Sequence, residues 1–244
     1  MLLRAIRVRW LGSLDPGHQH RTRLVREVIE QNVNSRRVLL LDVGCGDAQL
    51  CGAMLLGPLR GRLTYLGLDS DVARVRCARV WTSDSSSTRA LMIGGSAGAL
   101  PLKPESCDSV VCIDVLEHVE DWEAAVKEMG RLLRPRGVLV IHVPLDRQER
   151  FFSSLRQWSQ RDHVRIGLAE KQLCRSVADA GILVERVQRT FGPGMRVLWE
   201  LGEFKTALRT VVRVLLAPLV RFTCWFERCY PPSTGNGLLL VGRK

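Results

Sequence analysis

The feature that most constrains the fold is a continuous apolar run, VLLLDV at 38–43, which leads directly into a G-x-G turn at Gly44 and Gly46. A short strand without polar alternation is typical of a parallel sheet, in which helices bury both faces of the strand. Glycine permits a tight turn and lets a ligand approach the backbone closely. The stretch predicts a strand–loop–helix unit, and the loop is interpreted either as a ligand site or as a plain tight turn.

Segments of strand length and helix length alternate through most of the chain. Such alternation with short connections predicts an α/β fold with a doubly wound, mostly parallel sheet and ligands at the carboxyl ends of its strands. The final strand follows another strand without a regular crossover helix, so we expect it to pair antiparallel. Helices are expected over 18–33, 50–56, 71–81, 121–133 (capped by Asp121) and 170–180, and strands over 38–43, 63–69, 91–93, 109–113, 138–143, 182–187 and 237–243.

Length and composition favour one domain with a buried core. The chain has 244 residues, of which 46% are hydrophobic, enough for a core in a single α/β unit. We expect a basic N-terminal segment and helix over 1–35, followed by one domain over 36–244. The eight cysteines include no C-x-x-C pair and follow no apolar signal segment. They predict reduced, mostly buried thiols in a cytoplasmic protein.

The formal net charge is +11 and is carried mostly by arginine. A strong positive charge favours an anionic partner, which can be a membrane surface, nucleic acid or an acidic substrate. An arginine-rich solvated surface is the alternative interpretation.

The residues around the glycine turn restrict its ligand. A dinucleotide site has a third glycine, in G-x-G-x-x-G, but Gln49 stands at that position and Asp47 lies at the start of the next helix. A carboxylate there repels phosphate, so the loop favours a ligand with an ammonium or sulfonium group. Asp69 ends the second strand, 25 residues after Gly44. It can accept hydrogen bonds from both hydroxyls of a ribose, or it can simply cap the next helix.

Four segments in order, LLLDVGCGDA, LGLDSD, CDSVVCIDVLEHVEDW and RLLRPRGVLVIHVP, resemble the successive motifs of class I S-adenosylmethionine-dependent methyltransferases of the ubiquinone-biosynthesis-like type 11 group. The resemblance spans roughly 36–187 and implies a Rossmann-like, seven-stranded sheet with an antiparallel last strand. It also implies S-adenosylmethionine as the cofactor. The implied contacts are Asp42, Gly44, Cys45 and Gly46 at the methionine end, Asp69 at the ribose, Ser70 beside the adenine, and Ile113 after the fourth strand.

The chain departs from the family pattern at one place. The family usually has a G-D-A segment whose aspartate reaches the adenine amino group, whereas this chain has Gly95, Ser96 and Ala97. Serine accepts a hydrogen bond without charge, so we expect Ser96 and Ala97 to contact the adenine more weakly or through the backbone.

His118 and Asp114 are the predicted catalytic residues, because they follow the fourth strand at the mouth of the crevice. A general base assists transfer to a hydroxyl, and His118 is the first candidate; an architectural role for the motif is the alternative. Asp114, Glu117 and His118 are similar to the E-x-x-E-H metal site of some methyltransferases, but that set lacks a further ligand. We predict no metal, and we expect His163 in a loop on the substrate side.

A long segment, 191–235, precedes the last strand, and we expect a helical insertion there. Pro218 and the arginines argue against a membrane-spanning helix. An interfacial helix on an anionic membrane and a cap over the substrate pocket both fit. On a helical projection the arginines share about one third of the circumference, at Arg209, Arg213, Arg221 and Arg228. The rest of the circumference carries Phe222, Trp225 and Phe226. We expect the N-terminal segment to extend this basic and aromatic surface through Arg4, Arg7, Arg9 and Trp10.

The function predicted from these features is S-adenosylmethionine-dependent methylation, at oxygen, of a small-molecule, lipid-like or glycan acceptor. A nucleic-acid methyltransferase and a non-catalytic protein with the cofactor fold are the alternatives. IDVLEH stands where amino-methylating enzymes commonly carry N/D-P-P-Y, which disfavours nucleic acid as the partner. We expect a cytoplasmic protein, with peripheral contact to the inner face of a membrane as a further possibility.

Overall fold

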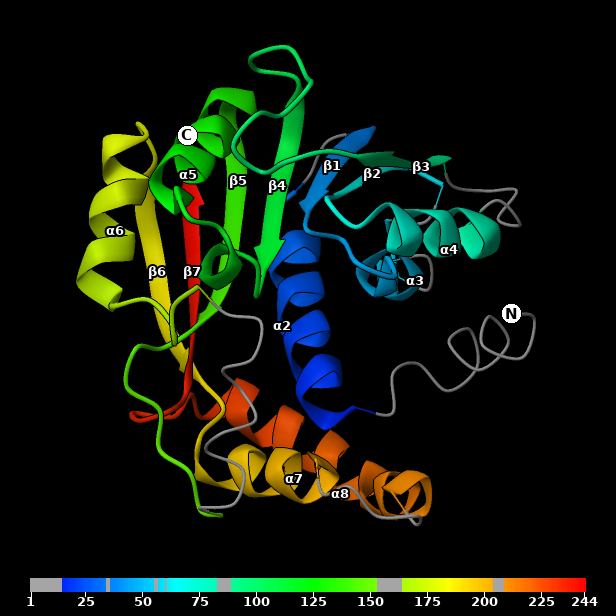
Figure 1. The fold of residues 1–244 in the computed structure, drawn as a ribbon, viewed down its shortest axis with the longest axis vertical. Coiled ribbons are helices and arrows are strands. Elements are labelled where there is room, and N and C mark those ends of the chain that lie inside the picture. Colours follow the sequence, from blue (N-terminus) through cyan, green and yellow to red (C-terminus); the bar gives the residue numbers. More distant parts are fainter. Residues whose placement is uncertain are drawn as a thin grey trace.

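The computed structural model describes residues 15–33, 36–54, 57–59, 61–82, 89–152, 164–203 and 209–244. Their centre is a seven-stranded sheet in the order β3-β2-β1-β4-β5-β7-β6 (Figure 1). The strands are β1 (Val38–Val43), β2 (Leu63–Asp69), β3 (Arg89–Gly94), β4 (Cys107–Ile113), β5 (Leu133–Pro144), β6 (Leu183–Thr190) and β7 (Gly237–Arg243). The helices are α2 (Pro16–Asn32), α3 (Gln49–Met54), α4 (Val72–Thr82), the 3₁₀ helix η1 (Leu116–His118), α5 (Trp122–Leu132), α6 (Glu170–Asp179), α7 (Pro193–Glu203) and α8 (Arg209–Cys229).

The strand directions confirm the predicted sheet. Strands β1 to β5 pair in parallel. Strand β7 lies between β5 and β6 and runs antiparallel to both, as predicted, although helices α7 and α8 separate it from β6 along the chain. The carboxyl ends of β1, β2 and β4 therefore meet at one edge of the sheet, where the glycine turn and Asp69 lie.

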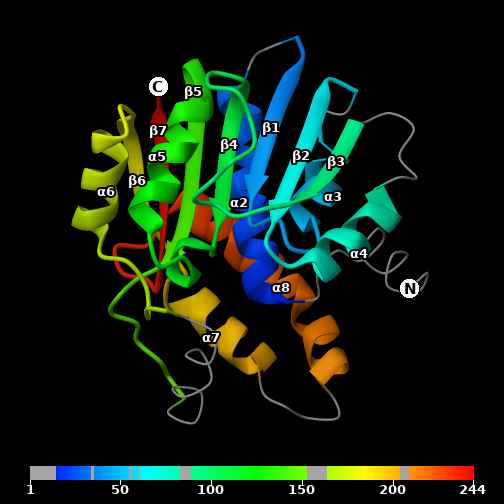
Figure 2. The same ribbon diagram turned by 45° about the horizontal axis from the view of Figure 1, so that its top comes forward.

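Helices bury both faces of the sheet, which explains the unbroken apolar run in β1 (Figure 2). Leu41 and Val43 belong to the core on the α5–α6 side, together with Val126 of α5. Val38 and Leu40, on the opposite face of the same strand, pack into the second core with α2 and α3. Successive side chains of a strand point to opposite faces, so the apolar residues of this run meet an apolar layer on either side.

Helix ends follow side-chain caps. The Asp121 carboxylate accepts the Ala124 N–H at 3.0 Å, which confirms the predicted N-cap of α5. Helix α2 begins earlier than predicted because the Asp15 side chain accepts the His18 N–H at 2.8 Å and Pro16 occupies the first turn. Pro at this position needs no backbone donor.

Strand β5 begins earlier than predicted. Leu133 pairs with Cys107, although Pro135 and Gly137 follow. The register shifts between Cys107 and Ser109, because the residues of β5 between Leu133 and Val138 have no regular partners in β4. These are the residues that the sequence pattern placed between the helix and the strand. The core of the strand, from Val138 onward, agrees with the prediction.

The insertion before β7 forms two helices, α7 and α8, which pack on each other and on α2 (Figure 1). The shared cluster has the buried members Phe191, Met195, Leu198, Val220 and Cys224. Helix α8 continues through Pro218. Among the described residues, none of the helices has both the length and the apolarity needed to cross a membrane. The predictions for Arg4, Arg7, Arg9, Trp10 and His163 lie outside the described residues.

Candidate cofactor and acceptor pocket

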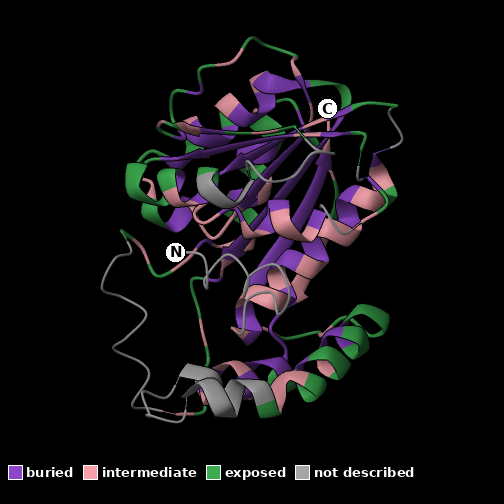
Figure 3. Ribbon diagram, turned by 90° about the vertical axis from the view of Figure 1, so that its right-hand side faces the viewer, coloured by how far each residue is buried: buried purple, intermediate pink, exposed green. Residues whose placement is uncertain are grey.

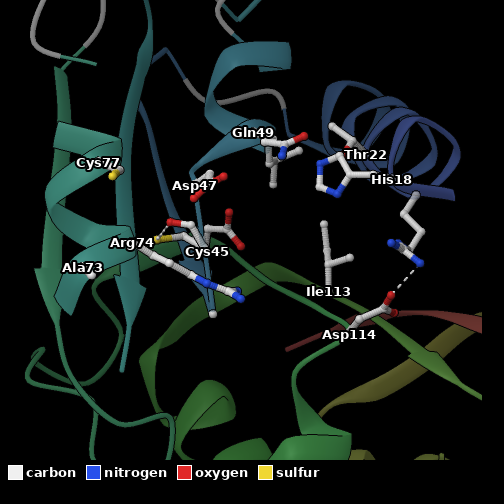
Figure 4. A pocket seen from close by; sticks show the side chains of 15 residues that line it. His18, Thr22, Cys45, Asp47, Gln49, Ala73, Arg74, Cys77, Ile113 and Asp114 are labelled. Carbon is white, nitrogen blue, oxygen red and sulfur yellow. Dashed lines mark hydrogen bonds and ion pairs between the residues drawn. The ribbon is translucent and has the colours of Figure 1, made fainter. Parts of the chain in front are cut away.

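A pocket of about 590 Å³ opens where α2 faces the carboxyl ends of β1 and β4 (Figure 4). His18 and Thr22 of α2 lie on one side of it, and Cys45 and Arg74 lie on the other. Its volume is within the range of pockets that hold small organic ligands. The described lining residues are His18, Arg21, Thr22, Asp42, Gly44, Cys45, Gly46, Asp47, Gln49, Leu50, Ala73, Arg74, Cys77, Ile113 and Asp114.

The glycine turn after β1 forms the floor of the pocket. The Gly44 and Cys45 N–H groups both donate to the Leu68 carbonyl, at 2.7 and 2.9 Å. Gly44 has a φ of +74°, and a Cβ there would overlap the Val115 side chain. Gly46 has a φ of +52°, and the nearest atom to a Cβ there would be Arg74 Nη1, at 3.8 Å. The first glycine is needed for packing, and the second leaves its backbone open to a ligand.

Asp69 braces this turn from the end of β2. Its two carboxylate oxygens accept the N–H groups of Gly46 and Asp71, each at 2.8 Å, and the residue is buried. Asp71, whose side chain accepts the Ala73 and Arg74 N–H groups, caps α4. Asp69 is therefore tied to the glycine turn itself, and it does not serve as the cap of the next helix.

Asp42 lies in β1 beneath the turn, where it is buried and lines the pocket. The Tyr65 hydroxyl of β2 donates a short hydrogen bond to its carboxylate. Burial raises the pKa of Asp42 to about 7, although the Tyr65 hydrogen bond opposes the rise. A cation bound nearby would stabilise the ionised carboxylate, because an opposite charge favours the charged form.

Helix α2 contributes a polar face to the pocket that the sequence analysis did not identify. His18, Arg21 and Thr22 line it, and the His18 Nε2 and Thr22 Oγ1 atoms are 3.1 Å apart. Burial, with a smaller effect of Arg21, lowers the pKa of His18 to about 4, so its imidazole is neutral at pH 7. The i, i+3, i+4 spacing of three polar residues was the available signal.

Asp114 follows β4 with a φ of +50° and joins α2 to the sheet. Its carboxylate contacts Arg21 Nη1 at 2.8 Å and His142 Nδ1 at 2.5 Å, and His142 Nε2 lies 2.9 Å from Thr190 Oγ1. Burial alone would raise the pKa of Asp114, but Arg21 and His142 outweigh it and hold that pKa below its ordinary value. An ionised carboxylate fixed in this way is a weak base and a firm anchor for Arg21.

The structure does not bring His118 to the pocket. His118 is exposed at the end of η1 and is absent from the described lining residues. Glu117 beside it is buried, and burial followed by the nearby Asp114 charge raises its pKa. Among the described residues there is no cluster of three or more His, Cys, Asp or Glu side chains suited to a metal ion, so Asp114, Glu117 and His118 do not form one there.

The predicted cofactor residues divide between those at the pocket and those outside it. Asp42, Gly44, Cys45, Gly46 and Ile113 line the pocket with Asp114, and Asp69 adjoins it through Gly46. Three others are not among the described lining residues: Ser70 is exposed, Ser96 Oγ lies 3.4 Å from the Gly98 N–H, and Ala97 packs in the core.

The polar groups of the pocket fit the methionine end of S-adenosylmethionine, which carries an ammonium and a carboxylate. Gln49 Oε1 and Arg21 Nε are buried, and neither atom has a hydrogen-bond partner among the described residues. An unsatisfied buried acceptor and donor in one pocket call for a ligand that supplies both partners. The ammonium and carboxylate of an amino acid would supply both partners.

Comparison with known proteins agrees with this chemistry. Residues 41–141, from β1 to β5, match the methyltransferase domain family. A probable S-adenosylmethionine-dependent methyltransferase of Mycolicibacterium smegmatis is 35% identical over 105 residues, which are 43% of this chain and 37% of that protein. A ubiquinone biosynthesis O-methyltransferase of Pseudomonas fluorescens is 34% identical over 110 residues, 45% of each chain. The matches thus span less than half the length of these relatives.

Solved structures show the same fold at low sequence identity. The [4+2]-cyclase SpnF superposes with a TM-score of 0.63 at 19% identity, covering 91% of this chain and 80% of that one. A putative sarcosine dimethylglycine methyltransferase from Galdieria sulphuraria gives a TM-score of 0.62 at 17% identity, covering 91% and 83%. The matched segment, residues 41–141, is thus similar to the methyltransferase domain family, and the solved structures show that the chain has the Rossmann-like fold of S-adenosylmethionine-dependent methyltransferases.

Proposed function

We propose that this protein transfers a methyl group from S-adenosylmethionine to an oxygen atom of a small-molecule, lipid-like or glycan acceptor. The observation that carries the proposal is the pocket in which the glycine turn, the braced Asp69 and the unsatisfied Gln49 and Arg21 atoms meet. The match to ubiquinone biosynthesis O-methyltransferases supports oxygen as the acceptor atom.

In this proposal the chain's residues bind and orient the cofactor. Gln49 and Asp42 accept hydrogen bonds from the ammonium group, and Arg21, held by Asp114, donates to the carboxylate. Asp69 keeps Gly46 in place at the ribose. When bound, S-adenosylmethionine supplies a methyl group on a sulfonium, which is already an activated leaving group.

The residues of the pocket promote the reaction mainly by positioning and by excluding water. An efficient general base has a pKa near the working pH, whereas His18 has a pKa of about 4 and Asp114 is fixed in its ionised form. We propose that the neutral His18 accepts a hydrogen bond from the acceptor hydroxyl and orients its oxygen. His118, exposed on η1, has no such position.

A transfer assay with methyl-labelled S-adenosylmethionine and a fractionated cell extract tests the function. We expect the label in a small-molecule or lipid fraction, in a product that resists protease and nuclease. Label that nuclease releases would replace this acceptor with nucleic acid. Cofactor binding without transfer to any fraction would favour the non-catalytic alternative.

A further inference from the structure

Helix α8 is exposed along its outer side (Figure 3), and many of the exposed side chains there are large and apolar. Half of the large hydrophobic side chains that are exposed among the described residues lie in α8 or at the residue directly after it. Leu215, Phe222 and Tyr230 are 73%, 57% and 65% exposed. Their spacing, close to whole helical turns, keeps them on one face. Together they form an apolar stripe, whose members are Leu215, Leu219, Phe222, Trp225, Phe226 and Tyr230.

The aromatic members form a continuous surface. The Phe222 ring lies 5.8 Å from that of Trp225 and 6.4 Å from that of Phe226, and Phe226 lies 5.2 Å from Tyr230. Tryptophan and tyrosine, with an apolar ring and a polar group, favour the boundary between water and lipid. A contiguous apolar patch of this kind marks an interaction site on a soluble domain.

The opposite face of α8 is already occupied, so the stripe is not the face that holds the helix to the protein. Val220 and Cys224 pack into the cluster shared with α7. Glu227 is buried and its Oε2 lies 3.0 Å from Nε2 of His20 in α2. Helix α8 therefore does not cap the pocket with its aromatic face.

The charge around the stripe is positive. Arg221 is exposed beside it, and Arg228 is exposed although it lies 3.5 Å from Glu27. The only acidic residue in the α8 sequence is Glu227, which faces inward. An apolar face flanked by arginine is typical of helices that lie in the interface of an anionic bilayer.

We propose that the outer face of α8 docks this protein on an anionic lipid bilayer. The apolar stripe enters the boundary between headgroups and acyl chains, while Arg221 and Arg228 contact the headgroups. Because the inner face of α8 packs on α2, whose His18, Arg21 and Thr22 line the pocket, docking places the pocket close to the membrane. The proposal concerns binding alone and does not depend on methyl transfer.

Vesicle sedimentation of the full chain tests the proposal. The probes are vesicles of phosphatidylcholine with phosphatidylglycerol and vesicles of phosphatidylcholine alone. We expect the protein to sediment with the anionic vesicles, and F222E/F226E to weaken that binding by about tenfold or more, since it places charge in the apolar interface. The matched control is L91E/L183E, which adds the same charge at exposed leucines of β3 and β6 and should bind like the wild type.

Two further measurements test the contribution of charge and the folding of the stripe variant. Arg221→Gln should weaken binding to anionic vesicles, and added salt should reduce that binding. S-adenosylmethionine binding by F222E/F226E, measured in the same samples, should equal that of the wild type and shows that the variant is folded. The proposal is overturned if the wild type ignores anionic vesicles, if neutral vesicles bind it equally, or if the stripe variant binds unchanged. A wild-type dimer that the stripe variant converts to a monomer, without vesicle binding, would instead assign the stripe to a second copy.

Discussion

The two walls of the pocket differ in how their residues are held. The sheet wall, made of the glycine turn, Asp69 and Asp42, is fixed by hydrogen bonds between neighbouring strands. The helical wall, α2, is fixed by side-chain pairs that span long stretches of sequence, such as Arg21 with Asp114 and His20 with Glu227. The sheet wall therefore depends on hydrogen bonds close to the glycine turn, whereas the helical wall depends on tertiary contacts with the loop after β4 and with the insertion.

A substitution in the sheet wall should have the largest effect. In Gly44→Ala the new Cβ meets Val115 at a φ of +74°. We expect a loss of about 2–4 kcal/mol in the free energy of unfolding. We also expect about a hundredfold weaker S-adenosylmethionine binding by calorimetry, because the turn must move. Gly61→Ala is the matched control: its φ is +82°, no atom lies within 4 Å of a Cβ, and it is outside the pocket. Equal effects of the two substitutions would contradict the role assigned to Gly44.

The helical wall should respond to a change far from the pocket. Glu227→Ala removes one member of a buried pair, which we expect to cost about 2–3 kcal/mol in denaturant unfolding. The control is Glu185→Ala, which removes a partly exposed partner of Arg243 and should cost less than about 1 kcal/mol. If both variants lose the same stability, the pair between α2 and α8 does not hold this wall.

Asp42→Asn should raise the stability of the protein and weaken its binding of S-adenosylmethionine. Burial raises the pKa of Asp42 from 3.8 to about 7, so the folded state binds the proton more tightly than the unfolded state does. Between about pH 4 and pH 7 the ionisation of Asp42 therefore lowers the free energy of unfolding as the pH rises. We expect Asp42→Asn to be more stable than the wild type by about 4 kcal/mol at pH 8, and nearly equally stable near pH 4. It should bind S-adenosylmethionine more weakly. A stability difference independent of pH would refute this account of Asp42.

The smallest expected effect is on the rate of methyl transfer, in substitutions of two histidines. His18→Ala should reduce the rate of methyl transfer by about tenfold, because His18 orients the acceptor in the pocket. His118→Ala should change that rate by less than about twofold, since His118 is exposed on η1. The reverse order, measured with the acceptor found by labelling, would restore His118 as the catalytic residue.

Much of the sheet wall was predictable from the sequence. The apolar run of β1, the G-x-G turn and the aspartate after β2 are local signals whose meaning does not depend on distant residues. Asp121 was predictable as a cap for the same reason. The succession of strands along the chain was also predictable, but the early start of β5 was not, because pairing with Cys107 overrides Pro135 and Gly137.

The helical wall was not predictable in the same way. The spacing of His18, Arg21 and Thr22 indicates a polar face of α2, but it does not place that face in the pocket, because its position depends on how α2 packs against β4 and β5. The sequence assigned catalysis to His118 by its distance from β4, but η1 turns that side chain toward solvent. The partners of Asp114, Arg21 and His142, are 93 and 28 positions away along the chain, so only the folded structure reveals them.

The central claim is that this pocket binds S-adenosylmethionine with Asp69 bracing the ribose end. Calorimetric titration of the cofactor into the wild type, Asp69→Ala and Asp108→Ala tests it most directly. Asp108 also accepts a backbone N–H, from Leu39 at 2.8 Å, but it lies at the amino end of β4, away from the pocket. We predict that the wild type and Asp108→Ala bind alike and that Asp69→Ala loses about tenfold or more in affinity. Unchanged affinity in Asp69→Ala, or no binding by the wild type, would contradict the claim.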